Sequence, residues 1–205
     1  MFFGCDLAKI DFHNIKIMIV GVLAIQGSFE EHKLALVKMN IDVCEVRTKK
    51  DLEKCDALIM PGGESTTIDK LLKIYGLNKE IISRVKGRMP IYGTCAGAIL
   101  LAKKIEDNHG VEGLKLMDIS ISRNAYGRQL DSFETEIDFE GQKAEAVFIR
   151  APKILQTGVG VEILAKYNNE PVLVRQNNML AGTFHPELTN GKAIYEYFLA
   201  MIADK

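Results

Sequence analysis

A short apolar strand that runs into a glycine-flanked cysteine constrains the fold of this chain more than any other feature. Residues 89–92 read Met-Pro-Ile-Tyr, and the turn G-T-C-A-G follows at residues 93–97. Small and apolar residues then continue through Leu101, as suits a helix. Glycines on both sides of a reactive residue permit a sharp strand-to-helix turn that bulkier residues would block. We therefore expect Cys95 at such a turn, with its thiol held out into solvent.

Alternating strand and helix patterns in the first half of the chain predict an α/β fold. Strands are expected at 17–25, 42–47, 57–60 and 89–92, and helices at 28–39, 51–54, from 66 onward and after the cysteine turn. Ser28-x-x-Glu31 is a capping-box pattern that would open the first helix. Beyond Gly113 the sequence has β segments separated by turn pairs such as Glu140-Gly141, and then a closing helix at 190–203. The predicted architecture is a mostly parallel central sheet flanked by helices on both faces, with an antiparallel β extension.

Length and charge limit the domain count and the kind of partner. The 205 residues fit one α/β domain, which we place at residues 18–205, with residues 1–17 as an N-terminal extension of unknown role. The 26 basic and 27 acidic residues leave a formal net charge of -1, without the broad positive field of a nucleic-acid binder. The substrate is therefore expected to be small, and no nucleic acid is expected.

The apolar runs and the cysteines indicate where the protein acts and whether it has a metal site. The longest apolar run, at 17–25, is far shorter than the roughly 20 residues that cross a bilayer, so no membrane role is expected. The four cysteines form no C-x-x-C pair and no cluster with histidine, so neither a metal site nor a disulfide framework is indicated. Free thiols fit the reducing cytoplasm, where we expect the protein to act.

His185-Pro186-Glu187 is the second group with a chemical meaning. Proline favours an extended backbone at the residue before it, and residues two apart in extended chain project to the same side. Glu187 can therefore lie beside the His185 imidazole, fix its tautomer and stabilise its protonated form. His185 would take the thiol proton from Cys95 and later return a proton to the leaving group. The predicted catalytic residues are Cys95 as nucleophile, His185 as base and Glu187 as orienting group.

Each of these two motifs also has a plain structural interpretation. Most free cysteines are small buried hydrophobes, and H-P-E alone also fits a turn with a surface carboxylate. The two motifs together favour the catalytic interpretation. The remaining histidines, His13, His32 and His109, lie in polar sequence and are expected at the surface. The cysteines Cys44 and Cys55 are assigned to packing or to the surface without a role.

The loop P-G-G-E-S-T-T at residues 61–67 follows a predicted strand and is the third candidate element. Its glycines let backbone N–H groups approach a ligand closely, but it lacks the lysine-containing pattern of a phosphate loop. Its amides, with Gly63 foremost, could join the Ala96 N–H in an oxyanion hole. The alternative is an ordinary strand-to-helix turn capped by Ser65.

Taken in order, the motifs resemble those of the triad glutamine amidotransferases, and among them the glutaminase subunit of pyridoxal 5′-phosphate synthase. The resemblance runs from about Met18 to the C-terminus, and G-x-C-x-G with H-P-E marks the wider superfamily. Other sequence blocks narrow the resemblance from the superfamily to this subunit. They are G-V-L-A-I-Q-G at 21–27, P-G-G-E-S-T-T at 61–67, R-N-A-Y-G-R-Q at 123–129, F-I-R-A-P at 148–152 and F-H-P-E-L at 184–188.

The resemblance implies a fold, a reaction and a partner. The fold would be the flavodoxin-like, three-layer arrangement of class I glutamine amidotransferases, in a single glutaminase domain at 18–205. The reaction would be hydrolysis of L-glutamine to L-glutamate and ammonia through a cysteinyl thioester, without a bound cofactor. Ammonia would pass to a synthase (lyase) subunit, a (β/α)8 barrel in a large hetero-oligomer, that builds the vitamin B6 cofactor.

Family likeness also implies residue roles. Gln26 and Gly27 would face the synthase subunit, and a guanidinium at Arg123 suits the α-carboxylate of an amino acid. The residues that would hold glutamine are Gly63, Glu64, Ser65, Arg123, Ile149 and Arg150. Because an isolated glutaminase would waste glutamine, we expect low activity in the lone subunit and a rise on partner binding, through the backbone of residues 62–64.

Three other functions remain compatible with the sequence. The chain could serve another ammonia-consuming enzyme, or it could be a γ-glutamyl or cysteine hydrolase on the same scaffold. It could also be a silent partner that only assembles or regulates a complex, which the complete set of reacting groups disfavours.

Overall fold

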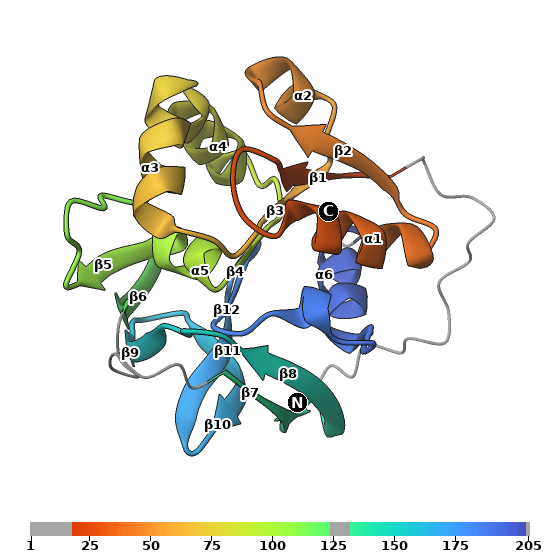
Figure 1. Cartoon of the computed structure of the whole chain (residues 1–205), viewed down its shortest axis with the longest axis vertical. Coiled ribbons are helices and arrows are strands. Elements are labelled where there is room, and N and C mark those ends of the chain that lie inside the picture. Colours follow the sequence, from red (N-terminus) through yellow and green to blue (C-terminus); the bar gives the residue numbers. More distant parts are fainter. Residues whose placement is uncertain (1–17, 124–131, 204–205) are drawn as a thin grey trace.

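The computed structural model describes residues 18–123 and 132–203, and a seven-stranded sheet forms its middle layer (Figure 1). In spatial order the strands are β10 (Glu162–Tyr167), β11 (Glu170–Gln176), β12 (Met179–Gly182), β4 (Ile91–Thr94), β3 (Ala57–Met60), β1 (Ile19–Leu23) and β2 (Asp42–Val46). The neighbours from β12 to β2 pair in parallel, whereas β10 and β11 extend the sheet with antiparallel pairing. The predicted sheet, mostly parallel with an antiparallel extension, is confirmed.

Two smaller sheets come from the middle of the chain. The first contains β5 (Ala102–Glu106), β6 (Met117–Ser122) and β9 (Lys153–Thr157). The second is the hairpin of β7 (Phe133–Phe139) and β8 (Gln142–Phe148), which turns at the predicted pair Glu140-Gly141. Both turn residues have positive φ, 52° and 76°, as tight hairpin turns require.

Helices cover both faces of the central sheet (Figure 1). One face carries α2 (Lys49–Glu53), α3 (Ser65–Ile74), α4 (Leu77–Lys86) and α5 (Ala96–Leu101), and the other carries α1 (Phe29–Lys38) and α6 (Ala193–Ala203). Strand side chains alternate between the two cores, so that Leu58 packs in the first core and Ile59 in the second. None of the helices in the described parts of the chain has the length and hydropathy that a membrane span needs.

Helix boundaries depart from the sequence expectation where side chains cap them differently. Helix α2 begins at Lys49 rather than Asp51, because Thr48 and Asp51 form a reciprocal capping box. Helix α3 is capped by the carboxylate of Glu64, which accepts hydrogen bonds from the backbone N–H groups of Thr66 and Thr67. The alternative of a cap at Ser65 is therefore wrong.

Parallel pairing brings the carboxyl ends of β1, β3, β4 and β12 to one edge of the sheet. Ligands of open α/β sheets bind outside this edge. The four segments that follow these strands contain all three candidate motifs and the Gln26-Gly27 pair. The fold therefore gathers the candidate residues from distant parts of the chain.

Helix α5 lies unusually close to the sheet at Gly97. A Cβ on this residue would lie 2.1 Å from the backbone oxygen of Met60 in β3, and a Cβ on Gly93 would lie 2.6 Å from the backbone of Gly97. Neither contact can relax by a side-chain rotation, because the opposing atoms are backbone. The glycines of G-x-C-x-G thus allow strand, turn and helix to pack closely around Cys95.

We predict that Gly97→Ala lowers the free energy of unfolding by about 3 kcal/mol, because the added methyl group must push α5 away from β3. Urea unfolding followed by circular dichroism measures the change. Gly191→Ala is the matched control, since a Cβ there has its nearest neighbour at 3.5 Å, and it should change stability by less than about 1 kcal/mol. Equal stability of the Gly97 variant and the unaltered chain would refute the close-packing argument.

Candidate active site

Cys95 occupies the predicted strand-to-helix turn between β4 and α5. Its backbone has φ 47° and ψ -103°, a conformation that costs a non-glycine residue about 1–3 kcal/mol. The surrounding sheet imposes it, because the Cys95 N–H donates to the carbonyl of Gly182 in β12 at 2.8 Å. Strain of this kind occurs where a residue must project from a sharp turn.

The thiol is buried, so the expectation that it points into solvent is wrong. Cys95 is only 7% exposed. The loop after β3 covers it from one side, since a Cβ on Gly62 would lie 3.3 Å from the Cys95 Cβ. The carbonyl oxygen of Ile149, after β8, lies 4.0 Å from the sulfur. The covering segments are far away in sequence, which is why the local turn pattern could not reveal them.

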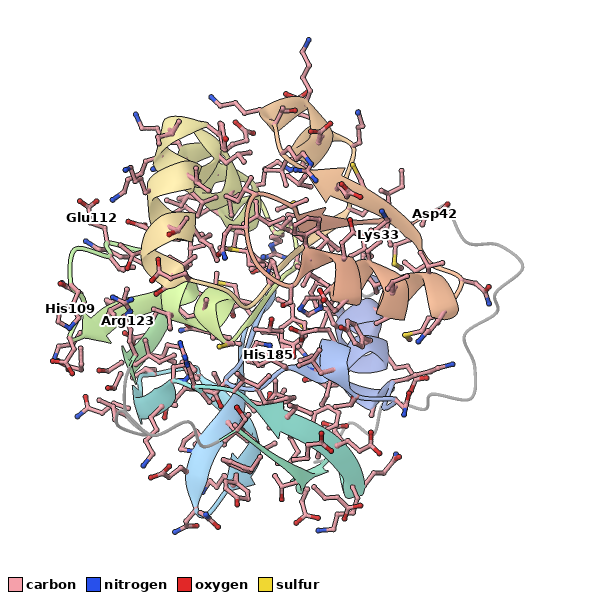
Figure 2. The ribbon with its side chains drawn as sticks, viewed as in Figure 1. Lys33, Asp42, His109, Glu112, Arg123 and His185 are labelled. Atoms are coloured by element: carbon pink, nitrogen blue, oxygen red, sulfur yellow. The ribbon has the colours of Figure 1, made fainter. Side chains whose placement is uncertain are left out.

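His185 and Glu187 stand next to each other, as the H-P-E spacing predicts. The Nδ1 atom of His185 lies 2.7 Å from Oε1 of Glu187, which belongs to a short 3-10 helix, η3 (Pro186–Leu188). A hydrogen bond from the His185 N–H to the carbonyl of Val147 at 2.8 Å holds the histidine backbone. The His185 and Cys95 side chains flank the same point, since a Cβ on Gly62 would lie 2.4 Å from Cε1 of His185 and 3.3 Å from Cβ of Cys95. The imidazole and the carboxylate are therefore in contact with the Cys95 side chain beside them, and Figure 2 shows His185 near the centre of the molecule.

The surroundings of His185 favour its protonated, imidazolium form. Burial lowers the pKa of His185, but its hydrogen bonds with Cys95 and Glu187 outweigh burial and raise the pKa to about 10. Burial raises the pKa of Glu187, but His32, His185 and the Ser28 hydroxyl outweigh it and lower the pKa to about 2. Glu187 is therefore ionised and His185 can hold a proton at neutral pH, ready to be given to a leaving group.

Two further residues of this network were missed by the sequence analysis. The Ser28 hydroxyl donates to Oε1 of Glu187 at 2.6 Å instead of capping α1, so the predicted capping box with Glu31 is wrong. His32 is 0% exposed and its Nε2 lies 3.3 Å from Oε2 of Glu187, so its expected surface position is wrong. His109 is exposed as expected, and His13 lies outside the described residues.

The loops after β1 and β3 are joined by hydrogen bonds. The Ser28 N–H donates to the carbonyl of Gly62 at 3.1 Å, and the Glu64 N–H donates to Oε1 of Gln26 at 2.9 Å. A Cβ on Gly27 would lie 1.9 Å from the Gly62 oxygen, so only glycine fits there. The half-buried Gln26-Gly27 pair thus holds the loop that contains Gly63. An oxyanion hole at Gly63 and Ala96 stays a prediction.

Some of the predicted glutamine-binding residues meet at one place and others do not. Arg123 donates to Oε1 of Glu64 at 3.4 Å and to Oγ1 of Thr66 at 3.1 Å. Ser65, the first residue of α3, is buried beside them in the chain. Ile149 faces Cys95 through its carbonyl, whereas Arg150 is exposed. The binding roles stay predictions, and residues 124–129 of the R-N-A-Y-G-R-Q block lie outside the described residues.

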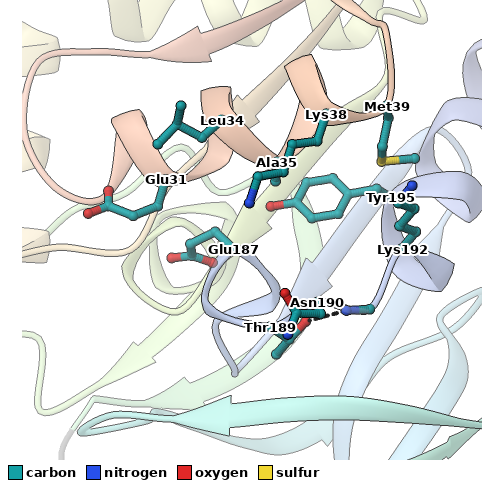
Figure 3. Close-up of a pocket in the computed structure, with 11 residues that line it drawn as sticks. Glu31, Leu34, Ala35, Lys38, Met39, Glu187, Thr189, Asn190, Lys192 and Tyr195 are labelled. Atoms are coloured by element: carbon teal, nitrogen blue, oxygen red, sulfur yellow. Dashed lines mark hydrogen bonds between the residues drawn. The ribbon is translucent and has the colours of Figure 1, made fainter.

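A cavity of about 280 Å³ lies beside Glu187, between α1 and the segment that leads into α6 (Figure 3). Its lining includes Glu31, Lys38, Glu187, Lys192 and Tyr195, but neither member of the Cys95–His185 pair. This cavity therefore borders Glu187 but does not contain the candidate nucleophile and base.

The His185 interactions predict how stability depends on pH. A folded-state pKa of about 10, above the ordinary 6.5, stabilises the folded chain fully below pH 6.5 and loses that contribution as pH rises through 10. As pH rises from 6.5 to 10, the unfolding free energy of the unaltered chain should fall by about 3–5 kcal/mol more than that of His185→Gln. Urea unfolding at pH 6, 8 and 10 measures it. The exposed control His109→Asn should follow the unaltered chain, and parallel pH profiles for His185→Gln would contradict the assignment.

Comparison with known proteins agrees with this geometry. The profile of the SNO glutamine amidotransferase family matches residues 22–204. "Pyridoxal 5'-phosphate synthase subunit PdxT" of Pseudothermotoga lettingae is 50% identical over 190 residues, covering 92% of this chain and 97% of that protein. The protein of the same name from Thermosipho africanus is 48% identical over 187 residues, covering 90% and 99%. A crystal structure of a glutamine amidotransferase, 48% identical, covers 90% of this chain and 98% of its own with a TM-score of 0.86. This chain therefore belongs to the SNO glutamine amidotransferase family.

Proposed function

We propose that this chain is the glutaminase subunit of a pyridoxal 5′-phosphate synthase and hydrolyses L-glutamine to L-glutamate and ammonia. The observation that carries the proposal is the buried series of Cys95, His185 and Glu187, in a family member about half identical to proteins named as that subunit. A nucleophile, a base and an orienting carboxylate in contact are the groups that acyl transfer from an amide needs.

The reaction begins with attack on the side-chain amide of glutamine. The Cys95 thiol gives its proton to His185 and its sulfur forms a bond to the amide carbon, while the carbonyl π electrons move to the oxygen, which becomes negative. The backbone N–H groups of Gly63 and Ala96 stabilise that oxygen, and each such donor typically contributes roughly 10²–10³ in rate. The conformational freedom of a glycine backbone allows the Gly63 peptide to rotate and present its N–H.

His185 moves the protons of the later steps. Its nitrogen remote from Glu187 donates a proton to the amide nitrogen, the C–N bond breaks, and ammonia leaves the γ-glutamyl thioester. A water molecule then attacks the thioester carbon while His185 takes a proton from it, and the C–S bond breaks to release glutamate. Glu187 stabilises the imidazolium at each stage, which its low pKa of about 2 supports.

Recognition of glutamine is assigned to the residues that the family likeness implies, with Arg123 as the main cationic contact proposed for the substrate. Its present contact with Glu64, at 3.4 Å, is long for a charge-assisted hydrogen bond and can give way to a substrate carboxylate. The full proposed set is Gly63, Glu64, Ser65, Arg123, Ile149 and Arg150.

The proposed partner is the synthase subunit, a (β/α)8 barrel within a large hetero-oligomer, which receives the ammonia. Gln26 and Gly27 are proposed to face it, because they are half-buried and contact the loop at 62–64 directly. Residues 18–205 would act as one glutaminase domain in the cytoplasm. The free thiols of Cys44, Cys55 and Cys95 support a reducing compartment.

Cys95→Ala should abolish the reaction, with glutamate release reduced at least about 1,000-fold because no other group can form the thioester. The measurement is glutamate production from L-glutamine with the synthase subunit present. Cys44→Ala is the matched control and should keep the rate. Undiminished glutamate release by the Cys95 variant would refute the proposal, and turnover of γ-glutamyl peptides in preference to glutamine would point to a different hydrolase.

Partner binding should raise the glutaminase rate, by at least about tenfold if a Gly63 N–H must rotate into the oxyanion hole. The test compares glutamate release with the synthase subunit added and withheld, at the same glutamine concentration. Equal rates under the two conditions would contradict activation by the partner, while leaving the glutaminase assignment intact.

A further inference from the structure

Helix α1 presents two side chains to the carboxylate of Glu187, one helical turn apart. Ser28 donates to Oε1 at 2.6 Å, and His32 approaches Oε2 with its Nε2 at 3.3 Å. The turn between them is closed by a hydrogen bond from the His32 N–H to the Ser28 carbonyl. Residues four apart on a helix lie on the same face, so both contacts follow from the placement of one helix. The carboxylate is held from that side at both oxygens.

His32 is itself fixed from behind. Its Nδ1 lies 2.7 Å from the Tyr195 hydroxyl of α6, and its Nε2 lies 3.1 Å from Oγ1 of Thr94 in β4. The Tyr195 ring packs against the imidazole edge-on, with 5.9 Å between centroids. Burial raises the pKa of Tyr195 well above 10, so its hydroxyl keeps its proton and donates it to Nδ1. The His32 proton therefore resides on Nε2, which faces Thr94 and Glu187.

A buried histidine satisfied by tyrosine and threonine would ordinarily be explained by core packing alone. The surroundings of the Glu187 carboxylate indicate that His32 has a role beyond core packing. Its Oε2 is buried and makes no hydrogen bond of good geometry with the described residues. The Nε2–H of His32, which also faces Thr94, lies 3.3 Å from this oxygen and is close enough for a dipole interaction. Without it, half of an ionised carboxylate would have no favourable contact on its protein side.

The neutral state of His32 suits this task. Burial lowers the pKa of His32 more than the neighbouring Glu187 and Glu31 raise it, and His185 lowers it further. At neutral pH it acts on Glu187 as an N–H dipole and not as a full charge. A second imidazolium here would compete with His185 for the carboxylate. The other titratable group that faces it, Tyr195, stays neutral as well.

We propose that Ser28 and His32 form a clamp on Glu187 and are positioning residues for the reaction, extending the series Cys95–His185–Glu187 back to helix α1. This inference rests on the proposed glutaminase function. Neither residue touches the reacting atoms. Each acts through Glu187, which must keep its orientation for His185 to face the sulfur and hold its proton.

Removal of the clamp should reduce kcat and leave substrate binding almost unchanged. For His32→Leu we expect kcat for glutamate release to fall roughly 10-fold, because the loss of the N–H dipole leaves Oε2 of the ionised carboxylate without a favourable contact. The KM for glutamine should stay within about twofold. His32→Gln places an amide donor near the position of Nε2 and should restore part of the rate. Val37→Ala, on the exposed face of the same helix, is the matched control and should behave as the unaltered chain.

A double-mutant cycle separates positioning from simple support of the fold. In a Glu187→Gln background the loss of His32 should cost less than about twofold in kcat, because its target is gone. Ser28→Ala should show the same dependence on Glu187. Assays contain the synthase subunit, and thermal unfolding verifies that each variant is folded. Should His32→Leu fail to fold, His32→Gln and Ser28→Ala provide the same cycle.

The outcomes distinguish the clamp from the function on which it rests. Equal costs of His32 loss with and without Glu187 would overturn the clamp, as would an unchanged kcat in the single variants. Absence of glutamate release by the unaltered complex would overturn the proposed function itself. A cost that disappears in the Glu187→Gln background, together with an unchanged KM, would establish the clamp.

Discussion

The burial of an ionised carboxylate at Glu187 is the interaction on which the rest of the site depends. Removing a carboxylate from water costs several kcal/mol unless other groups replace the lost hydration. Here Ser28, His32 and His185 replace it, and together they lower the pKa to about 2 although burial acts in the opposite direction. These partners come from α1 and from the segment after β12, so the site exists only when both pack against the sheet.

Close backbone contact is the second constraint, and glycines make it possible. Gly97 brings α5 against β3, Gly62 lies against Cys95 and His185, and Gly27 lies against the Gly62 carbonyl. As a result three segments touch one after another along one edge of the sheet: the turn at Cys95, the loop at 61–64 and the loop at 26–28. A change at Gln26 can therefore reach the Cys95 turn through the contacts of two loops.

Local patterns predicted local structure well in this chain. The strand-to-helix turn at Cys95, the adjacency of His185 and Glu187 and the alternating first half follow from glycine, proline and apolar spacing, whose effects reach only a few residues. The same reasoning failed for Ser28, His32 and the exposure of Cys95. Ser28 has a nearer capping role available in sequence, and nothing local shows that Glu187, 159 positions away, accepts its hydroxyl instead. A serine and a histidine four apart on an amphipathic helix was the available signal.

The sequence by itself determined the fold class, the elements and the family motifs, because backbone preferences and hydrophobic periodicity act over short distances. Only the tertiary structure decided which groups surround Glu187, why the sulfur is covered and how the loops at 26–28 and 61–64 meet. Parallel pairing of β1, β3, β4 and β12 brings those segments to one sheet edge, and contacts between segments so far apart in the chain depend on the packed arrangement of the whole domain.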